Sequence, residues 1–199
     1  ESGAVAKGRY TWVIDPLDGT HNYLRGIPHC AVSIAMVENE EPLHAVIYDP
    51  FRGDLFTASK GDGALLNDRR IRCSVREHLD GALLATGFPY RERAHLPTQL
   101  EMVRVLLARA EDLRRTGSAA LDLAYTASGR FDGFFEIGLK PWDIAAGCLL
   151  MREAGGHYCD FMGGTGLPPS GHLVAGALGV VDDILKAIGP VLPADLRTH

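Results

Sequence analysis

The stretch "WVIDPLDGTHNY" (residues 12–23) places two carboxylates three positions apart, directly behind an apolar run. Pro16 fixes its own φ and is expected to turn the chain out of a strand at this point. The carboxylates of Asp15 and Asp18, with the carbonyl of Leu17 between them, would then point toward one spot. Oxygen ligands of this kind suit hard cations such as Mg²⁺. The spacing therefore predicts a site for divalent cations.

The next two residues extend this chemistry. Gly19 and Thr20 lie at an expected helix start, where free backbone N–H groups suit a phosphate oxygen. The alternative is purely structural: Asp15 caps a turn, and Asp18-Gly19 forms an ordinary β-turn. Local spacing alone leaves both readings open.

A second acidic position lies far along the chain. Asp143 follows Trp142 in the first turn of an expected apolar helix, and a lone Asp at such a place is often an N-cap. The small residues 145–147 behind it would let that helix pack closely. Glu136 ends an apolar strand, where a buried acid needs a partner.

Regular elements must position these residues. Residues 131–139 and 172–178 read as strands of the second half. Helical spacing covers 97–115, with apolar residues at Leu100, Val103, Leu106, Leu107 and Ala110. A second helix within 117–130 would begin at Ser118 and stop at Gly129. Two further helices are expected at 142–156 and 180–192.

The first half is richer in strands. Strand-like runs cover residues 11–15, 29–38, 43–50, 50–58 and 82–88, with a short hairpin at 60–71 whose tip is Asn67-Asp68. Strands mixed with helices predict layered α and β structure. We divide the chain into an α+β half, residues 1–100, which carries "DPLDGT", and an α/β half, residues 101–199, which carries "PWDIAAG".

Composition narrows the class of protein. A net charge of −5 and a pI near 5.9 argue against a broad nucleic-acid-binding face. Because no apolar run reaches the roughly 18 to 20 residues that span a bilayer, we expect a soluble protein without membrane contact. The four cysteines lack CxxC spacing and are expected to be reduced, mostly buried thiols of a cytoplasmic protein, rather than disulfides or zinc ligands.

"DPLDGTHNY" and "PWDIAAG", in this order, resemble the two signatures of the inositol monophosphatase family. "LLATGFPY" and "RRTGSAALDLAYTASGRFDGFFEIGLKPWD" are similar to the bacterial, extragenic-suppressor type of inositol-1-monophosphatase. The resemblance covers essentially the whole chain. It implies a layered αβαβα sandwich of the sugar-phosphatase type, here expected to lack the N-terminal helices.

The resemblance also assigns roles. It implies two to three Mg²⁺ per site, with Asp15 bridging two ions, the Leu17 carbonyl completing the first, and Asp18 and Asp143 holding the second. Thr20 would orient the attacking water, so Thr20 and Asp15 form the implied catalytic set. Arg114 would approach the substrate, although a solvated surface position fits it equally well. The implied substrate-binding residues are Leu17, Asp18, Gly19, Thr20, Arg114, Gly117, Ser118, Ala119, Glu136 and Asp143.

The implied activity is Mg²⁺-dependent, lithium-sensitive hydrolysis of myo-inositol 1-phosphate by direct transfer to water. Other esters used in the superfamily stay open: fructose 1,6-bisphosphate, 3′-phosphoadenosine 5′-phosphate, histidinol phosphate and NADP. A homodimer is also implied. Relatives act in transcription antitermination through RNA polymerase and transcription factors. The basic stretch Arg69, Arg70, Arg72 and Arg76 suits such a contact, or is simply a solvated rim.

One departure concerns the first residues. The family carries two consecutive glutamates shortly before the first strand, and the first of them binds the first metal. This chain opens "ESG", so Glu1 matches the second glutamate. We expect a truncated N-terminus. A molecule that began at Glu1 would bind the first metal weakly and lose most activity.

Overall fold

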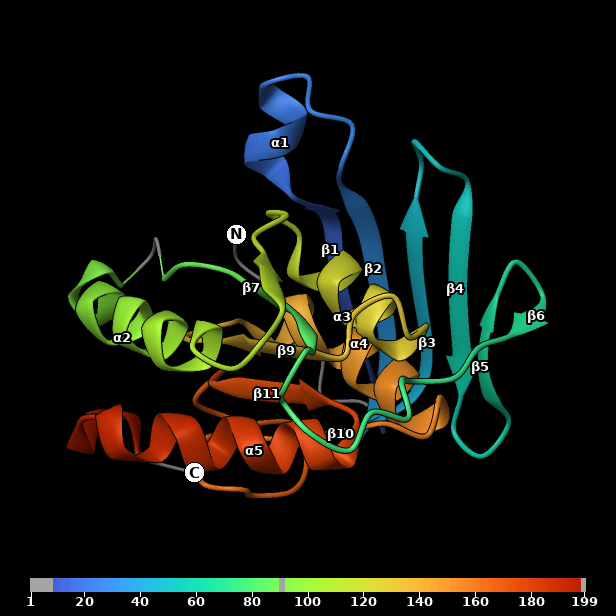
Figure 1. Cartoon of the computed structure of the whole chain (residues 1–199). Helices are drawn as coiled ribbons and strands as arrows, with labels where there is room; N and C mark the ends of the chain where they lie inside the picture. The colour runs from blue at the N-terminus through green and yellow to red at the C-terminus, as the bar shows by residue number, and fades with distance from the viewer. Residues whose placement is uncertain (1–8, 90–91, 198–199) are drawn as a thin grey trace.

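Two β-sheets dominate the computed structural model, which describes residues 9–89 and 92–197 (Figure 1). The first sheet has six strands in the order β1-β2-β3-β4-β5-β6, and every neighbouring pair is antiparallel. Its strands are β1 (Tyr10–Asp18), β2 (Ala31–Glu38), β3 (Glu41–Asp49), β4 (Asp54–Ser59), β5 (Gly63–Leu66) and β6 (Arg69–Arg70).

Alternation of side chains explains this sheet. Every second residue of β2 is buried, beginning with Ala31, as expected for a strand with one face on the core. Asn67 and Asp68, between β5 and β6, both have positive φ, the geometry of a tight hairpin turn. The predicted hairpin tip is therefore confirmed.

The second sheet has five strands in the order β10-β11-β9-β7-β8. Strand β7 runs parallel to β8 and β9, and the β9–β11 and β11–β10 pairs are antiparallel. Its strands are β7 (Leu83–Thr86), β8 (Asp112–Arg114), β9 (Gly133–Glu136), β10 (His157–Cys159) and β11 (Leu173–Gly176). Every residue of β9 and β11 is buried, as in strands covered on both faces.

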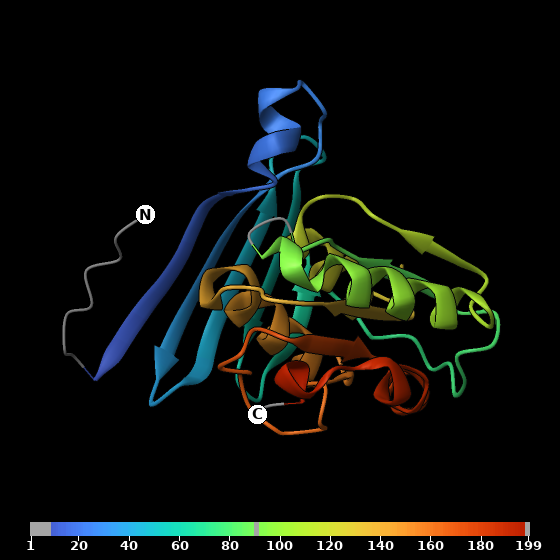
Figure 2. The same ribbon diagram turned by 90° about the vertical axis from the view of Figure 1, so that its left-hand side faces the viewer.

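The longer helices form two layers. Helices α3 (Ala119–Ala127) and α4 (Pro141–Glu153) lie between the sheets, whereas α2 (Leu96–Leu107) and α5 (Leu178–Ile188) pack together beyond the second sheet (Figure 2). The described residues thus form β–α–β–α layers, which confirms the layered α/β class. The short helix α1 (Thr20–Leu24) projects beyond the end of the first sheet (Figure 1).

Close helix packing needs small residues. A Cβ atom on Gly147 of α4 would lie 2.6 Å from the Cβ of Leu123 on α3, so glycine is required where the two helices meet. All four cysteines are buried and unpaired, as the sequence predicts. In the part of the chain that the structure describes, no helix combines the length and apolarity that a bilayer crossing requires.

Two expectations about the elements were wrong, and one strand was given no bounds from the sequence. Strand β1 does not end at Pro16 but continues to Asp18. Helix α2 ends at Leu107, and the tail of its predicted range forms strand β8. For β10, the sequence placed only His157 in a strand context, without bounds. The first sheet is complete by Arg70, and the division into halves at residue 100 stays a prediction.

Candidate metal centre

A β-bulge places Asp15 and Asp18 on the same face of the first sheet. Residues three apart in a regular strand point to opposite faces. Here Asp15 pairs with Ser33 and Asp18 with Ala31, so β1 holds one extra residue relative to β2. Because Ser33 and Ala31 both face the buried side, both carboxylates turn inward. The register, rather than a turn at Pro16, brings the two acids together.

Asp143 reaches the same place from the helix layer. It is the third residue of α4, is 4% exposed, and accepts a hydrogen bond from the backbone N–H of Lys140 at 2.8 Å. One carboxylate oxygen from each of Asp15, Asp18 and Asp143 lies within 4.8 Å of the others. The predicted convergence of three acids distant in sequence is present.

Asp18 is fixed by the N-terminus of α3. One of its carboxylate oxygens accepts hydrogen bonds from the Ser118 hydroxyl at 2.6 Å and from the Ala120 N–H at 2.9 Å. Ser118 also caps α3 by accepting from the Leu121 N–H, as predicted. Burial nonetheless raises the pKa of Asp18 to about 6, and the charges of Asp143 and Asp15 act in the same direction.

The turn after Asp18 is sterically constrained. Gly19 has φ of +83°, and a Cβ there would lie 2.9 Å from the carbonyl oxygen of His29, so only glycine fits. The Thr20 hydroxyl donates to the Leu17 carbonyl at 2.7 Å, and the Leu17 N–H donates to an Asp15 carboxylate oxygen at 2.9 Å. These bonds hold the Leu17 carbonyl between the two acids.

The three acids line a cavity of about 500 Å³. Two further carboxyls, Asp122 and Glu136, also line it, whereas Arg115 is the only permanently cationic side chain among the described lining residues. The full lining comprises Asp15, Leu17, Asp18, Gly19, Thr20, His21, Thr86, Gly87, Phe88, Arg115, Gly117, Ser118, Ala119, Asp122, Glu136, Leu139, Trp142 and Asp143.

Glu136 and Asp122 are buried acids. Burial raises the pKa of Glu136 well above its usual range, and nearby carboxylates, Asp122 first, add to this. Burial likewise raises the pKa of Asp122, although its carboxylate accepts from the Thr116 hydroxyl at 2.7 Å. A Cβ on Gly87 would meet the Glu136 carboxyl at 2.1 Å, so glycine is needed beside it.

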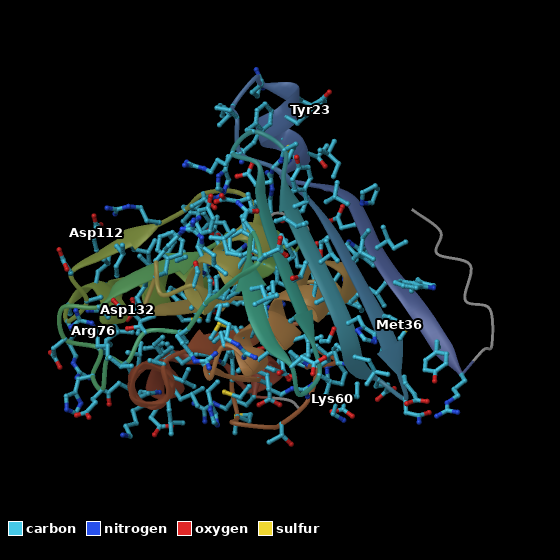
Figure 3. All side chains as sticks on the ribbon, turned by 90° about the vertical axis from the view of Figure 1, so that its right-hand side faces the viewer. Tyr23, Met36, Lys60, Arg76, Asp112 and Asp132 are labelled. Atoms are coloured by element: carbon cyan, nitrogen blue, oxygen red, sulfur yellow. The ribbon has the colours of Figure 1, made fainter. Side chains whose placement is uncertain are left out.

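All but one of the described residues predicted for the site line this cavity. The exception is Arg114, which lies on β8, is exposed, and forms an ion pair with Asp112 at the outer edge of the second sheet (Figure 3). Its neighbour Arg115 lines the cavity instead. Glu1, the predicted counterpart of a family glutamate, lies outside the described residues.

Sequence reasoning also missed Asp122 and Thr86. Thr86 ends β7, donates to the Phe135 carbonyl, and accepts from the side chain of Gln99 at 2.8 Å. The sequence held a signal for both residues. Asp122 is the one acid in a largely apolar helix. Gln99, the partner of Thr86, is a polar residue on the face of α2 that is buried in the structure.

The donor set fits Mg²⁺. Hard cations prefer oxygen ligands, and Mg²⁺ is usually held by one or two carboxylates together with substrate phosphate and water. Three carboxylates in mutual reach, with a carbonyl between two of them, supply that chemistry. The ionised carboxylates of this cavity would repel an anionic phosphate, so its close approach needs cations that offset their charge.

A layered two-sheet α/β fold with an acidic cluster at the ends of a strand and a helix defines the class of metal-dependent sugar-phosphatase folds. The sequence model of the inositol monophosphatase family matches residues 1–189. The chain therefore belongs to this family of metal-dependent phosphatases.

The chain also matches individual bacterial proteins that are named Nus factors. The chain is 55% identical over 194 residues to a Nus factor SuhB from Xylella fastidiosa, covering 94% of this chain and 70% of that protein. It is 50% identical over 200 residues to a Nus factor SuhB from Pasteurella multocida, covering 99% of this chain and 74% of that one.

Solved structures show the same fold. The extragenic suppressor protein suhB from Bartonella henselae matches with a TM-score of 0.87 and 43% identity, covering 92% of this chain and 70% of that chain. An inositol monophosphatase from Anabaena (Nostoc) matches with a TM-score of 0.88 and 40% identity, covering 94% and 77%.

Proposed function

We propose that the chain hydrolyses myo-inositol 1-phosphate to inositol and phosphate with Mg²⁺. The observation that carries this proposal is the approach of Asp15, Asp18 and Asp143 to within 4.8 Å of one another inside a cavity of about 500 Å³. Such a cavity has the size of a small-ligand site. Family membership supports the reaction class.

Asp15 would bridge two ions, the Leu17 carbonyl would complete the first, and Asp18 and Asp143 would hold the second. The number of ions is proposed as two to three. Bound Mg²⁺ would offset the charge of the phosphate and of the leaving oxygen, and would make water more acidic. No covalent phosphoenzyme is required.

The protein's own groups would position the reactants. The backbone of Gly19 and Thr20 borders the cavity beside the acids, where a phosphate would lie. Because the Thr20 hydroxyl donates its hydrogen bond to the Leu17 carbonyl, its oxygen remains able to accept a hydrogen bond from the attacking water and orient it.

The far side of the cavity suits an uncharged polyol. Glu136, whose pKa burial raises well above its usual range, could accept from a ring hydroxyl and, in its protonated form, also donate to one. Gly117 and Ala119 offer backbone groups nearby, whereas the Ser118 hydroxyl is engaged with Asp18. Arg115 faces the same space as a cation for a phosphate or hydroxyl oxygen.

Steady-state phosphate release from a panel of esters tests this assignment. Inositol 1-phosphate should give the highest kcat/KM, only with Mg²⁺ present, and Li⁺ should inhibit. The panel adds fructose 1,6-bisphosphate, 3′-phosphoadenosine 5′-phosphate, histidinol phosphate and NADP. A tenfold preference for any of these would replace the substrate but not the reaction class, and no Mg²⁺-dependent turnover of any ester would reject both.

A second proposal is contact with the transcription machinery, because the matched relatives are named Nus factors. Arg69, Arg70 and Arg72 are exposed on and beside the edge strand β6. Arg76 is less available, since it forms an ion pair with Asp132 at 3.3 Å (Figure 3). A homodimer and a cytoplasmic location are also proposed, on the resemblance alone.

Charge reversal separates the two roles. Arg69→Glu with Arg72→Glu should abolish co-purification with RNA polymerase and leave phosphate release unchanged, because both residues lie outside the cavity. Unchanged co-purification would reject this surface as the contact.

A further inference from the structure

The loop between β9 and α4 carries two of the proposed site residues. Glu136 ends β9, Asp143 lies in the first turn of α4, and both line the cavity together with Leu139. Between them the chain turns through Gly138, which has φ of +74°. Glu136 is paired with Leu173 of β11, and the loop beyond it contributes to holding the end of β9 and the start of α4 in place.

Gly171 and His172, which precede β11, accept hydrogen bonds from this loop. The backbone N–H of Leu139 donates to the Gly171 carbonyl at 2.9 Å, and the N–H of Gly138 donates to Nδ1 of His172 at 3.1 Å. The two segments are in close contact, because a Cβ on Gly171 would lie 1.9 Å from the Leu139 carbonyl oxygen. His172 is the side chain that joins them.

The setting of His172 keeps its Nδ1 an acceptor. The ring is 6% exposed and stacks on Phe161, with centroids 5.4 Å apart and planes at 21°. The rings of His95 and His172 are in a T-shaped arrangement, with centroids 6.4 Å apart. Burial first, and the charge of His95 second, lower the pKa of His172, while the carboxylates of Glu92, Asp195 and Asp160 act in the opposite direction. A neutral ring that accepts at Nδ1 carries its proton on Nε2.

We propose that His172 is a positioning residue of the active site, which fixes the 136–143 loop through the hydrogen bond from Gly138 to Nδ1. This rests on the proposed phosphatase function only for its kinetic consequence. Gly138 is adjacent to Ile137 and close to Glu136 in the chain, whereas Asp143 lies in α4, which packs against α3 and the first sheet, so the loss of the bond should disturb Glu136 more than the metal ligands. The expected consequence is weaker substrate binding rather than weaker Mg²⁺ activation.

Three variants separate the effect of the acceptor from that of the ring. His172→Asn places its side-chain oxygen where Nδ1 lies, so the bond is kept. His172→Phe keeps a ring on Phe161 but offers no acceptor. His172→Gln carries its oxygen one bond further out and replaces the phenylalanine variant if that one does not fold. His157→Phe, at an exposed histidine on β10, is the matched control.

The readouts are KM and kcat for phosphate release, the Mg²⁺ concentration for half activation, Tm, and hydrogen exchange at the Gly138 amide. His172→Phe should raise KM at least about fivefold, since a misplacement on the order of 1 Å can cost far more. Its Gly138 amide should exchange about tenfold faster. His172→Asn and His157→Phe should stay within about twofold of the parent in KM and in the exchange rate of the Gly138 amide.

The proposal would be overturned if His172→Asn and His172→Phe had equal KM values and equal Gly138 exchange rates. It would also be overturned if His172→Phe matched the parent in both. A fall in kcat at constant KM with a lowered Tm would overturn it as well, because it would mark a merely structural role. If the parent protein released no phosphate, the proposed function would fail, and Gly138 exchange would still decide whether His172 holds the loop.

Discussion

Replacing Asp18 by asparagine should stabilise the metal-free fold while removing a metal ligand. The side-chain amide has the shape of the carboxylate, and its oxygen can still accept from Ser118 and Ala120. The negative charge of Asp18, however, destabilises the folded protein, because the carboxylate is desolvated and lies near two other acids. Raising the pKa of Asp18 from 3.8 to about 6 amounts to about 3 kcal/mol of free energy of unfolding at neutral pH.

The expected effect is smaller than that figure, because Asp18 is only partly buried and solvent screens its charge. We expect Asp18→Asn to gain about 1.5 kcal/mol, which raises Tm by roughly 3–6 °C in a chain of this size. The gain depends on pH. The folded carboxyl binds its proton more tightly than the unfolded one, so the parent loses stability as pH rises from 3.8 through 6. The difference in free energy of unfolding between Asp18→Asn and the parent should reach its full value at pH 7.5 and nearly vanish at pH 4.

The assay is thermal unfolding in EDTA at pH 7.5 and pH 4, followed by the same scan at pH 7.5 with Mg²⁺. Saturation at a hundred times Kd adds about 2.7 kcal/mol to a protein that binds only when folded. Mg²⁺ should therefore reverse the order and make the parent the more stable protein. Asp62→Asn, at an exposed loop position, is the control and should change nothing. An asparagine variant less stable than the parent in EDTA at pH 7.5, or a difference independent of pH, would refute the reasoning.

Two further outcomes are expected. Gly147→Ala should cost about 1–3 kcal/mol and lower Tm by several degrees in a calorimetric scan, because its Cβ would lie 2.6 Å from that of Leu123; an unchanged Tm would mean that α3 and α4 separate freely. Arg115→Ala should raise KM for inositol 1-phosphate about tenfold, whereas Arg114→Ala should leave it within twofold; the reverse ranking in steady-state assays would return the substrate role to Arg114.

Local pattern predicted most elements and long-range pairing decided the rest. The β-rich composition of residues 29–38 and the cap at Ser118 are properties of a few neighbouring residues, and the strand and the cap both appear as predicted. The continuation of β1 past Pro16 depends on its register with β2. Residues 112–114 became a strand because β7 lies beside them, which helical spacing in the preceding segment does not reveal.

The same distinction holds for the site. Asp15, Asp18 and Asp143 were predicted by types and order along the chain, and the structure places them together. Which of Arg114 and Arg115 reaches the cavity depends on the alternation of side chains along β8. Arg114 shares one face of the strand with Asp112 and forms an ion pair with it. The burial of Asp122 follows from the position of α3 between two sheets, which a single helical pattern cannot give.

The most direct test of the central claim is an anomalous difference map from crystals of the protein grown with Mn²⁺ in place of Mg²⁺. Peaks should lie within coordination distance of carboxylate oxygens of Asp15, Asp18 and Asp143, and should vanish in Asp143→Asn crystals at the position that this residue ligates. A map with no peak among these three side chains at saturating Mn²⁺ would contradict the metal centre and the phosphatase chemistry built on it.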